Sequence, residues 1–137
     1  MTTIRSYREL EVWQIAEELF EMICEDYHKL PKNKIAWVIG DQVIRSIGSI
    51  GANIAEGFAR KTKKEFIYFL NISRGSNAES EVWTERMKRQ KFITPERHKI
   101  YADKFTRVAQ MLNALIRSLY QTENTRMNNT RNNELTK

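Results

Sequence analysis

The stretch RSIGSIGANIAEGFAR, residues 45–60, decides the fold, because its periodicity is that of a helix and its composition is unusual for one. Ile47, Ile50 and Ile54 recur at spacings of three and four, which predicts one buried helical face. Three glycines and three alanines stand among them, although each glycine inside a helix costs roughly 1 kcal/mol relative to alanine. A strip without side chains lets another helix approach closely. The stretch therefore predicts a helix that packs tightly against a neighbour.

Outward from this stretch, apolar residues at helical spacing predict three further helices, with Pro31 and Pro95 in the connections or at a helix start. The four expected helices occupy residues 9–29, 34–57, 62–91 and the segment from 94 onward. Thr94 is placed as an N-cap, with Pro95 at the first helical position. No alternation typical of strands accompanies them.

Four helices of similar length with short connections predict an all-α, antiparallel up-down-up-down four-helix bundle, one domain at residues 1–121. The remaining segment, TENTRMNNTRNNELTK at residues 122–137, is rich in Asn, Thr and Arg. Because it has almost nothing to bury, we expect it to form a disordered C-terminal tail.

Composition indicates where such a domain resides. No window approaches the roughly 18 apolar residues of a membrane span, and the N-terminal MTTIRSYREL lacks the apolar run of a signal peptide. The single cysteine, Cys24, excludes an internal disulfide and suits a reducing compartment. We therefore expect a cytoplasmic protein without a membrane segment.

A polar layer is expected between the second and third helices. The seam of the third helix is small and polar in its middle, at Ser73, Ser76 and Ser80. In a hairpin turning near residue 60, Arg45 falls opposite roughly residues 75–79. Four residues are expected to be largely buried and mutually bonded, as a structural polar network that fixes the register: Arg45, Asn53, Glu56 and Glu79. The alternative is that these groups face water and the glycines merely tolerate exposure.

Three segments also carry a family resemblance. YRELEVWQIAEELF at 7–20, DQVIRSIGSIGANIAEGFAR at 41–60 and KKEFIYFLNISRGSNAESE at 63–81 resemble the bacterial 23S rRNA intervening-sequence protein family, over about residues 7–120. The resemblance implies a four-helix bundle that assembles as a homo-oligomer, typically a pentameric ring, and has no associated enzymatic activity. It also implies kinship with an accessory protein of diversity-generating retroelements, which binds nucleic acid and a reverse transcriptase.

Independent of the resemblance, some apolar residues exceed what one bundle seam requires. They include Ile44, Ile67 and Val82, and closed cyclic assembly is the ordinary way to bury such a second face. Trp37 and Tyr68 are less clearly inward than the other aromatic residues, and stay open as interface or base-stacking residues.

Charge favours an anionic partner, because the net charge is +6 and the pI is about 9.5. In the expected topology, one end of the bundle collects Lys29, Lys32, Lys34, Lys88, Arg89, Lys91, Arg97 and Lys99, and the other end collects Arg5, Arg8, Arg60, Lys61, Lys63 and Lys64. The leading candidates for nucleic-acid contact run without an intervening acid beside a helix start: Arg60, Lys61, Lys63 and Lys64. The second candidate cluster is Lys88, Arg89 and Lys91. The alternative is that these are ordinary solvated, lysine-rich loops.

Catalytic signals are poor. Cys24, His28 and His98 could in principle hold a metal, but Cys24 is more simply a small core residue, so we expect no metal and no cofactor. Glu56 and Glu79 have arginine and amide neighbours, which indicates structure rather than acid–base chemistry.

Two classes of function stay open. The first is a non-enzymatic, oligomeric RNA-binding or ribonucleoprotein-scaffold protein. The second is a protein–protein adaptor, for example an accessory factor of a reverse transcriptase. An enzyme is a distant third, because no site for one is visible.

Overall fold

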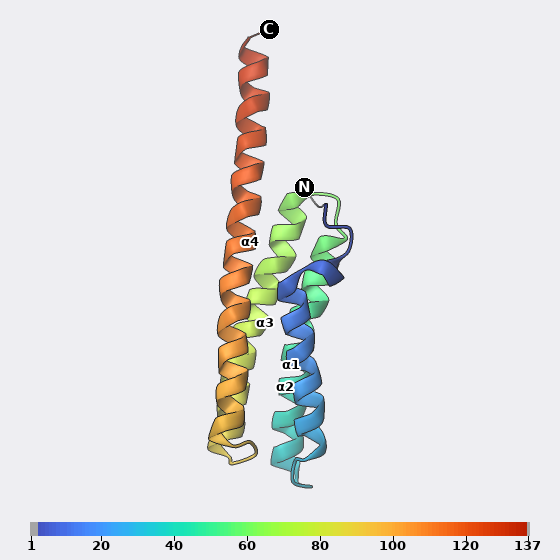
Figure 1. Ribbon diagram of the computed structural model, residues 1–137, viewed down its shortest axis with the longest axis vertical. Helices are drawn as coiled ribbons and strands as arrows, with labels where there is room; N and C mark the ends of the chain where they lie inside the picture. The colour runs from blue at the N-terminus through green and yellow to red at the C-terminus, as the bar shows by residue number, and fades with distance from the viewer. Residues whose placement is uncertain (1–2, 137) are drawn as a thin grey trace.

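Four long antiparallel α-helices make up the fold in the computed structural model, which describes residues 3–136 (Figure 1). The elements are a short 3-10 turn, η1 at Tyr7–Glu9, followed by α1 at Glu11–His28, α2 at Lys34–Phe58, α3 at Lys63–Arg89 and α4 at Pro95–Leu135. Each helix packs against the next, and α4 packs back against α1. Within the described range, no strand occurs and no helix has the length and apolar character that a membrane crossing requires. The expected all-α four-helix bundle is confirmed.

Three of the helices begin at side chains that satisfy the free N–H groups of the first turn. The side chains of Asn33, Thr62 and Thr94 each accept a hydrogen bond from a backbone N–H three residues later, at 2.9, 3.1 and 3.0 Å. Pro95 follows Thr94 at the start of α4, as the sequence predicts. The helix starts are thus encoded locally, which explains why they could be placed from the sequence.

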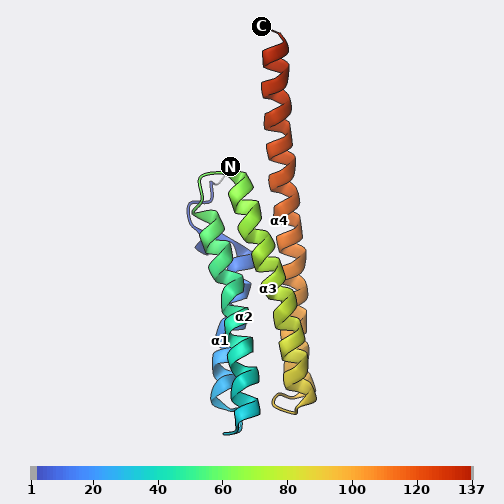
Figure 2. The same ribbon diagram turned by 180° about the vertical axis from the view of Figure 1, so that it is seen from behind.

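The core lies along the bundle axis and receives large side chains from all four helices. Fully buried members are Leu19, Ile23, Val43, Ile47, Ile50, Ile54, Leu70, Met87, Tyr101, Phe105, Val108 and Leu112. The buried face of α4 continues to Ile116, whereas Leu115 and Leu119 are only partly covered. Beyond that level α4 runs past the ends of the other helices (Figures 1 and 2).

The disordered tail is a wrong expectation for residues 122–135, because α4 continues through them as one helix. Only residue 137 of the expected tail lies outside the described range. A helix already nucleated in the bundle adds one backbone hydrogen bond per residue without a new nucleation cost. Hydroxyls of Thr122, Thr125 and Thr130 also donate to carbonyls one turn back, at 2.9, 2.9 and 3.0 Å. Composition indicates only what the segment could bury, and it does not show that the preceding helix supplies an already formed nucleus.

The expected network of Arg45, Asn53, Glu56 and Glu79 is also wrong in its charged members. The three charged side chains are exposed and bond to residues three or four positions away in the sequence: Arg45 to Gln42, Glu56 to Arg60, and Glu79 to the indole N–H of Trp83. Only Asn53 is half-buried, and its amide donates to the carbonyl and hydroxyl oxygens of Ser49, both at 2.8 Å. Charges stay outside because removing them from water costs more than a single partner returns.

A polar seam nevertheless separates α2 from α3, and its members are neutral. Ser73 donates to the backbone carbonyl of Ile50 at 2.8 Å, and the hydroxyls of Ser80 and Ser46 lie 3.0 Å apart. Close helix approach makes these short bonds reachable: a Cβ on Gly57 would lie 2.8 Å from a side-chain atom of α3. Gly57 of the 45–60 stretch thus faces α3, whereas Gly48 and Gly51 face side chains of α1. We define the buried hydroxyl contacts between α2 and α3 as the serine seam.

Candidate nucleic-acid interface

The basic residues gather at the two ends of the bundle. The connection 59–62 between α2 and α3 lies at one end, which we call the hairpin end. The connections 29–33 and 90–94 lie together at the opposite end, which we call the pocket end (Figure 1). The topology thus brings two connections that are far apart in the sequence together at the pocket end.

At the hairpin end, the four predicted cations do not form one uniform cluster. Arg60 pairs with Glu56, and its guanidinium lies 4.8 Å from the ring centre of Phe69. The neighbouring lysines belong to no ion pair among the described residues: Lys61, Lys63 and Lys64. Lys63 faces Arg126 of the α4 extension across a shallow hollow of about 510 Å³. Three lysines are therefore available, while Arg60 is engaged within the fold.

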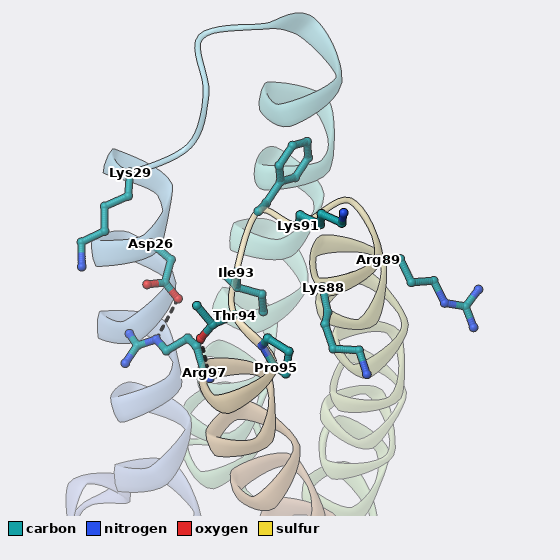
Figure 3. Close-up of a pocket in the computed structure, with 10 residues that line it drawn as sticks. Asp26, Lys29, Lys88, Arg89, Lys91, Ile93, Thr94, Pro95 and Arg97 are labelled. Carbon is teal, nitrogen blue, oxygen red and sulfur yellow. Dashed lines mark hydrogen bonds and ion pairs between the residues drawn. The ribbon is translucent and has the colours of Figure 1, made fainter.

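At the pocket end, an open pocket of about 850 Å³ lies against the α3–α4 connection (Figure 3). Its charged lining comes from three helices and two connections: Asp26 of α1, Lys29 of the α1–α2 connection, Lys88 and Arg89 of α3, Lys91 of the α3–α4 connection, and Arg97 of α4. Apolar residues complete the wall: Phe92, Ile93 and Pro95. The second predicted cluster thus lines a cavity, which sequence reasoning did not anticipate.

One carboxylate stands among these cations, and it is already satisfied. Asp26 is buried and accepts hydrogen bonds at Oδ2 from Arg97 Nε at 3.0 Å and from the Tyr101 hydroxyl at 2.5 Å (Figure 3 shows the first). Burial, together with the hydrogen bond to Asp26, raises the pKa of Tyr101 well above its ordinary value, so this hydroxyl remains a donor. We call these three residues the Asp26 cluster. The cluster joins α1 to α4, and the guanidinium of Arg97 offsets the negative charge of Asp26 inside the pocket.

The α3–α4 connection is held in a defined shape. Lys91 has a φ of 62°, the left-handed conformation that usually requires glycine. The backbone N–H of Phe92 donates to Met87 and that of Lys91 to Lys88, both at 2.9 Å, which together form a Schellman motif at the end of α3. This motif fixes the backbone position of Phe92, and therefore the point beside the pocket from which its side chain projects.

The free positive charge of the pocket comes from three lysines. Arg89 pairs with Glu85 at 2.9 Å and points away from the connection (Figure 3). By contrast, Lys29, Lys88 and Lys91 belong to no ion pair in the part of the chain that the structure describes. Burial and the nearby charge of Lys88 lower the pKa of His98 below its ordinary value. Lys29 reaches this pocket because α1 ends at the pocket end of the bundle.

An all-α bundle with a basic pocket at one end and a lysine-rich turn at the other is the class of protein that these observations define. The model of the family described as 23S rRNA-intervening sequence protein matches residues 8–114. The chain belongs to this family. The resemblance of the three sequence segments is thereby confirmed.

A solved structure has the same architecture. The crystal structure of a protein with unknown function from the S23 ribosomal protein family, from Bacteroides thetaiotaomicron VPI-5482, superposes with a TM-score of 0.71. The two sequences are 30% identical, over 77% of this chain and 97% of that chain. No curated protein matches this chain. The family match ends within α4, so the extension beyond the bundle lies outside it.

Proposed function

We propose that this chain is a non-enzymatic, oligomeric RNA-binding protein, or a ribonucleoprotein scaffold, that contacts phosphates through the basic ends of its bundle. One observation carries the proposal. Three lysines, from the α1–α2 connection, α3 and the α3–α4 connection, line an open pocket, and the one carboxylate among its described lining residues, Asp26, is already bonded within the fold. Unpaired cations around a cavity fit phosphate oxygens. The hairpin end supplies a second set of lysines.

Assembly would strengthen these contacts. We propose a homo-oligomer, with five subunits as the family resemblance implies, because repetition multiplies a weak patch by avidity. Large apolar side chains that remain 37–62% exposed on α2 and α3 support a second buried face: Ile35, Val38, Tyr68, Ile72 and Val82. Light scattering at micromolar concentration should give a multiple of the 16.3 kDa chain mass. A monomer mass would contradict the assembly and leave the basic ends to be tested separately.

The binding test compares charge reversals at the two ends. Lys88→Glu with Lys91→Glu, and Lys61→Glu with Lys63→Glu and Lys64→Glu, should each weaken binding of structured RNA or a DNA–RNA hybrid in filter-binding titrations. The control is a charge reversal of two exposed arginines of α4 that belong to neither basic cluster and form no ion pair among the described residues: Arg117 and Arg131. If about five phosphates are neutralised, the log–log salt slope should be about −4 to −5. No affinity of the parent at low salt would refute the proposal.

The second candidate is an adaptor for another protein, such as a reverse transcriptase. The exposed apolar side chains of α2 and α3 favour it, because they fit a protein partner as well as a second copy. In that case, the charge reversals leave capture of a purified reverse transcriptase unchanged, and the parent binds no RNA at moderate salt. For either function we propose a cytoplasmic location, supported by the single free Cys24.

A further inference from the structure

The pocket end combines two kinds of surface that a nucleic-acid backbone alone does not require. Its apolar wall consists of Phe92, Ile93 and Pro95, and its free cations are lysines. A phosphate backbone is satisfied by cations and polar donors on an open surface. An apolar wall beside cations instead fits a ligand with a flat apolar part and a negative part. A nucleotide has this chemistry, because its base stacks on aromatic side chains while its phosphate binds lysine.

The apolar wall is held in place before any ligand arrives. Ile93 is buried and anchors the connection in the core, and Phe92 is half-buried, so part of its ring remains available. The Schellman motif fixes the backbone at Lys91 and Phe92 from the α3 side. Pro95 fixes it from the α4 side. A platform that is already ordered loses little conformational entropy when a base stacks on it.

The charges around the wall are arranged on more than one side of it. Lys88 and Lys91 flank the α3–α4 connection, whereas Lys29 lies beyond Asp26 with its side chain pointing away from the connection (Figure 3). The Asp26 carboxylate, which would otherwise repel a phosphate, is bonded to Arg97 and Tyr101. The pocket is therefore left with the unpaired charges of the three lysines.

We infer that this pocket holds one unpaired nucleotide, with its base against Phe92 and its phosphate beside Lys88 and Lys91. The inference rests on the proposed nucleic-acid function and adds which part of the nucleic acid enters the fold. The volume of about 850 Å³ lies within the range of about 300–1,000 Å³ usual for small-ligand pockets. A base inside a duplex is stacked on both faces and does not enter such a pocket, whereas a base in a loop, bulge or overhang does.

Stacking on Phe92 recognises that a nucleotide is unpaired rather than which base it carries, because every base has a π-face. A base–aromatic stack of about 1–3 kcal/mol predicts roughly 5- to 150-fold tighter binding of an overhang than of a blunt end.

The experiment uses the full chain and an RNA hairpin with a single-nucleotide overhang of 2-aminopurine, whose fluorescence is quenched by stacking. The same hairpin with a blunt end is the reference, and 2-aminopurine riboside monophosphate is the free-nucleotide arm. Quenching of the overhang alone supports the inference and assigns the site to strand ends. Quenching of the free nucleotide as well supports it and extends the site to nucleotides in general. Quenching of neither overturns it.

Two leucine variants locate the stacking surface. Phe92→Leu keeps an apolar side chain on the connection but removes the ring, so it should abolish the preference for the overhang over the blunt end. Tyr68→Leu is the matched control, because Tyr68 is an aromatic side chain 62% exposed on α3, away from this pocket. Loss of the preference in Tyr68→Leu rather than in Phe92→Leu would overturn the inference.

The inference and the proposed function fail in different ways. If the parent binds overhang and blunt hairpins equally, the nucleotide pocket is wrong while RNA binding stands. If the parent binds neither hairpin at low salt, the proposed function is wrong. The quenching measured on the parent needs no variant, so a poorly folded Phe92→Leu chain does not prevent a decision.

Discussion

Two polar regions of the bundle both contain buried polar groups but satisfy them differently. In the Asp26 cluster, a carboxylate is held by Arg97 and Tyr101 of α4, which lie 71 and 75 residues further along the chain. In the serine seam, Ser73 and Ser80 are fully buried, and they bond to a backbone carbonyl and to another serine of α2. One region contains charge and the other is neutral.

The difference shows how helix spacing selects polar chemistry. A short hydroxyl reaches its partner only where two helices approach closely, which the small residues of α2 permit. A buried carboxylate needs a longer partner that keeps contact with water, and the side chain of Arg97 remains 27% exposed while that of Asp26 is 8% exposed. Charge is therefore placed at an end of the bundle, beside the pocket, and hydroxyls are placed between the helices.

The largest effect is expected from breaking the Asp26 cluster. Asp26→Ala should lower the free energy of unfolding by about 3 kcal/mol, because one partner of a buried charged pair and the acceptor of the Tyr101 hydroxyl disappear together. Urea unfolding at fixed protein concentration measures it. The matched control is Glu25→Ala, which removes a 66% exposed carboxylate that also contacts Arg97 and should cost less than about 1 kcal/mol. Equal losses in the two variants would show that the buried carboxylate has no special role.

The spacing of the serine seam is tested next. In Gly57→Ala, the new methyl group would lie 2.8 Å from Phe69 Cβ and 2.9 Å from Phe66 Cδ1. Overpacking costs about 1–3 kcal/mol, and the gain in helix propensity of about 1 kcal/mol offsets part of it. The upper part of the overpacking range applies because Phe69 Cβ is attached directly to the backbone and cannot rotate away, so we expect a net loss of about 1–2 kcal/mol in thermal or urea unfolding. A variant as stable as the parent would mean that α2 and α3 separate without cost.

The serine seam could be predicted from the sequence in outline, because its signals are local. Small residues recur at helical spacing on α2, and serines recur at the same spacing on α3. The error lay in assigning Arg45 and Glu79 to the interior. Sequence spacing places a residue on a helix face but does not state how far that face is turned from the neighbouring helix.

The Asp26 cluster and the pocket could not be predicted in the same way. Nothing in the sequence near Asp26 indicates that Tyr101 will reach it, because the contact depends on how α4 returns beside α1. The Schellman motif at Lys91 was equally hidden, since its usual signal is glycine. Charge content did place Lys88 and Lys91 at one end of the bundle, because that conclusion requires only the order of the helices.

A smaller effect of opposite sign is expected outside the serine seam. Gly75 lies within α3, and a Cβ built on it meets no atom within 4 Å. Gly75→Ala should therefore raise the free energy of unfolding by about 0.5–1 kcal/mol through helix propensity alone. Thermal unfolding beside Gly57→Ala gives the comparison directly. Destabilisation would instead reveal that another molecule packs on this face, for example a second copy of the chain.

The smallest effect concerns the electrostatic field beside the Asp26 cluster. His98 follows Arg97 on α4, and its pKa is lowered first by burial and then by Lys88, while Glu85 raises it. Lys88→Ala should therefore raise the pKa of His98 toward its ordinary value without restoring it fully, because burial remains. NMR titration of the imidazole protons measures this, with the exposed His28 as an internal control. A nucleotide phosphate bound at Lys88 would also oppose its charge, so saturating 2-aminopurine riboside monophosphate should shift the parent's His98 in the same direction. An unchanged pKa in Lys88→Ala would place this ammonium too far from α4 to act on a ligand in the pocket.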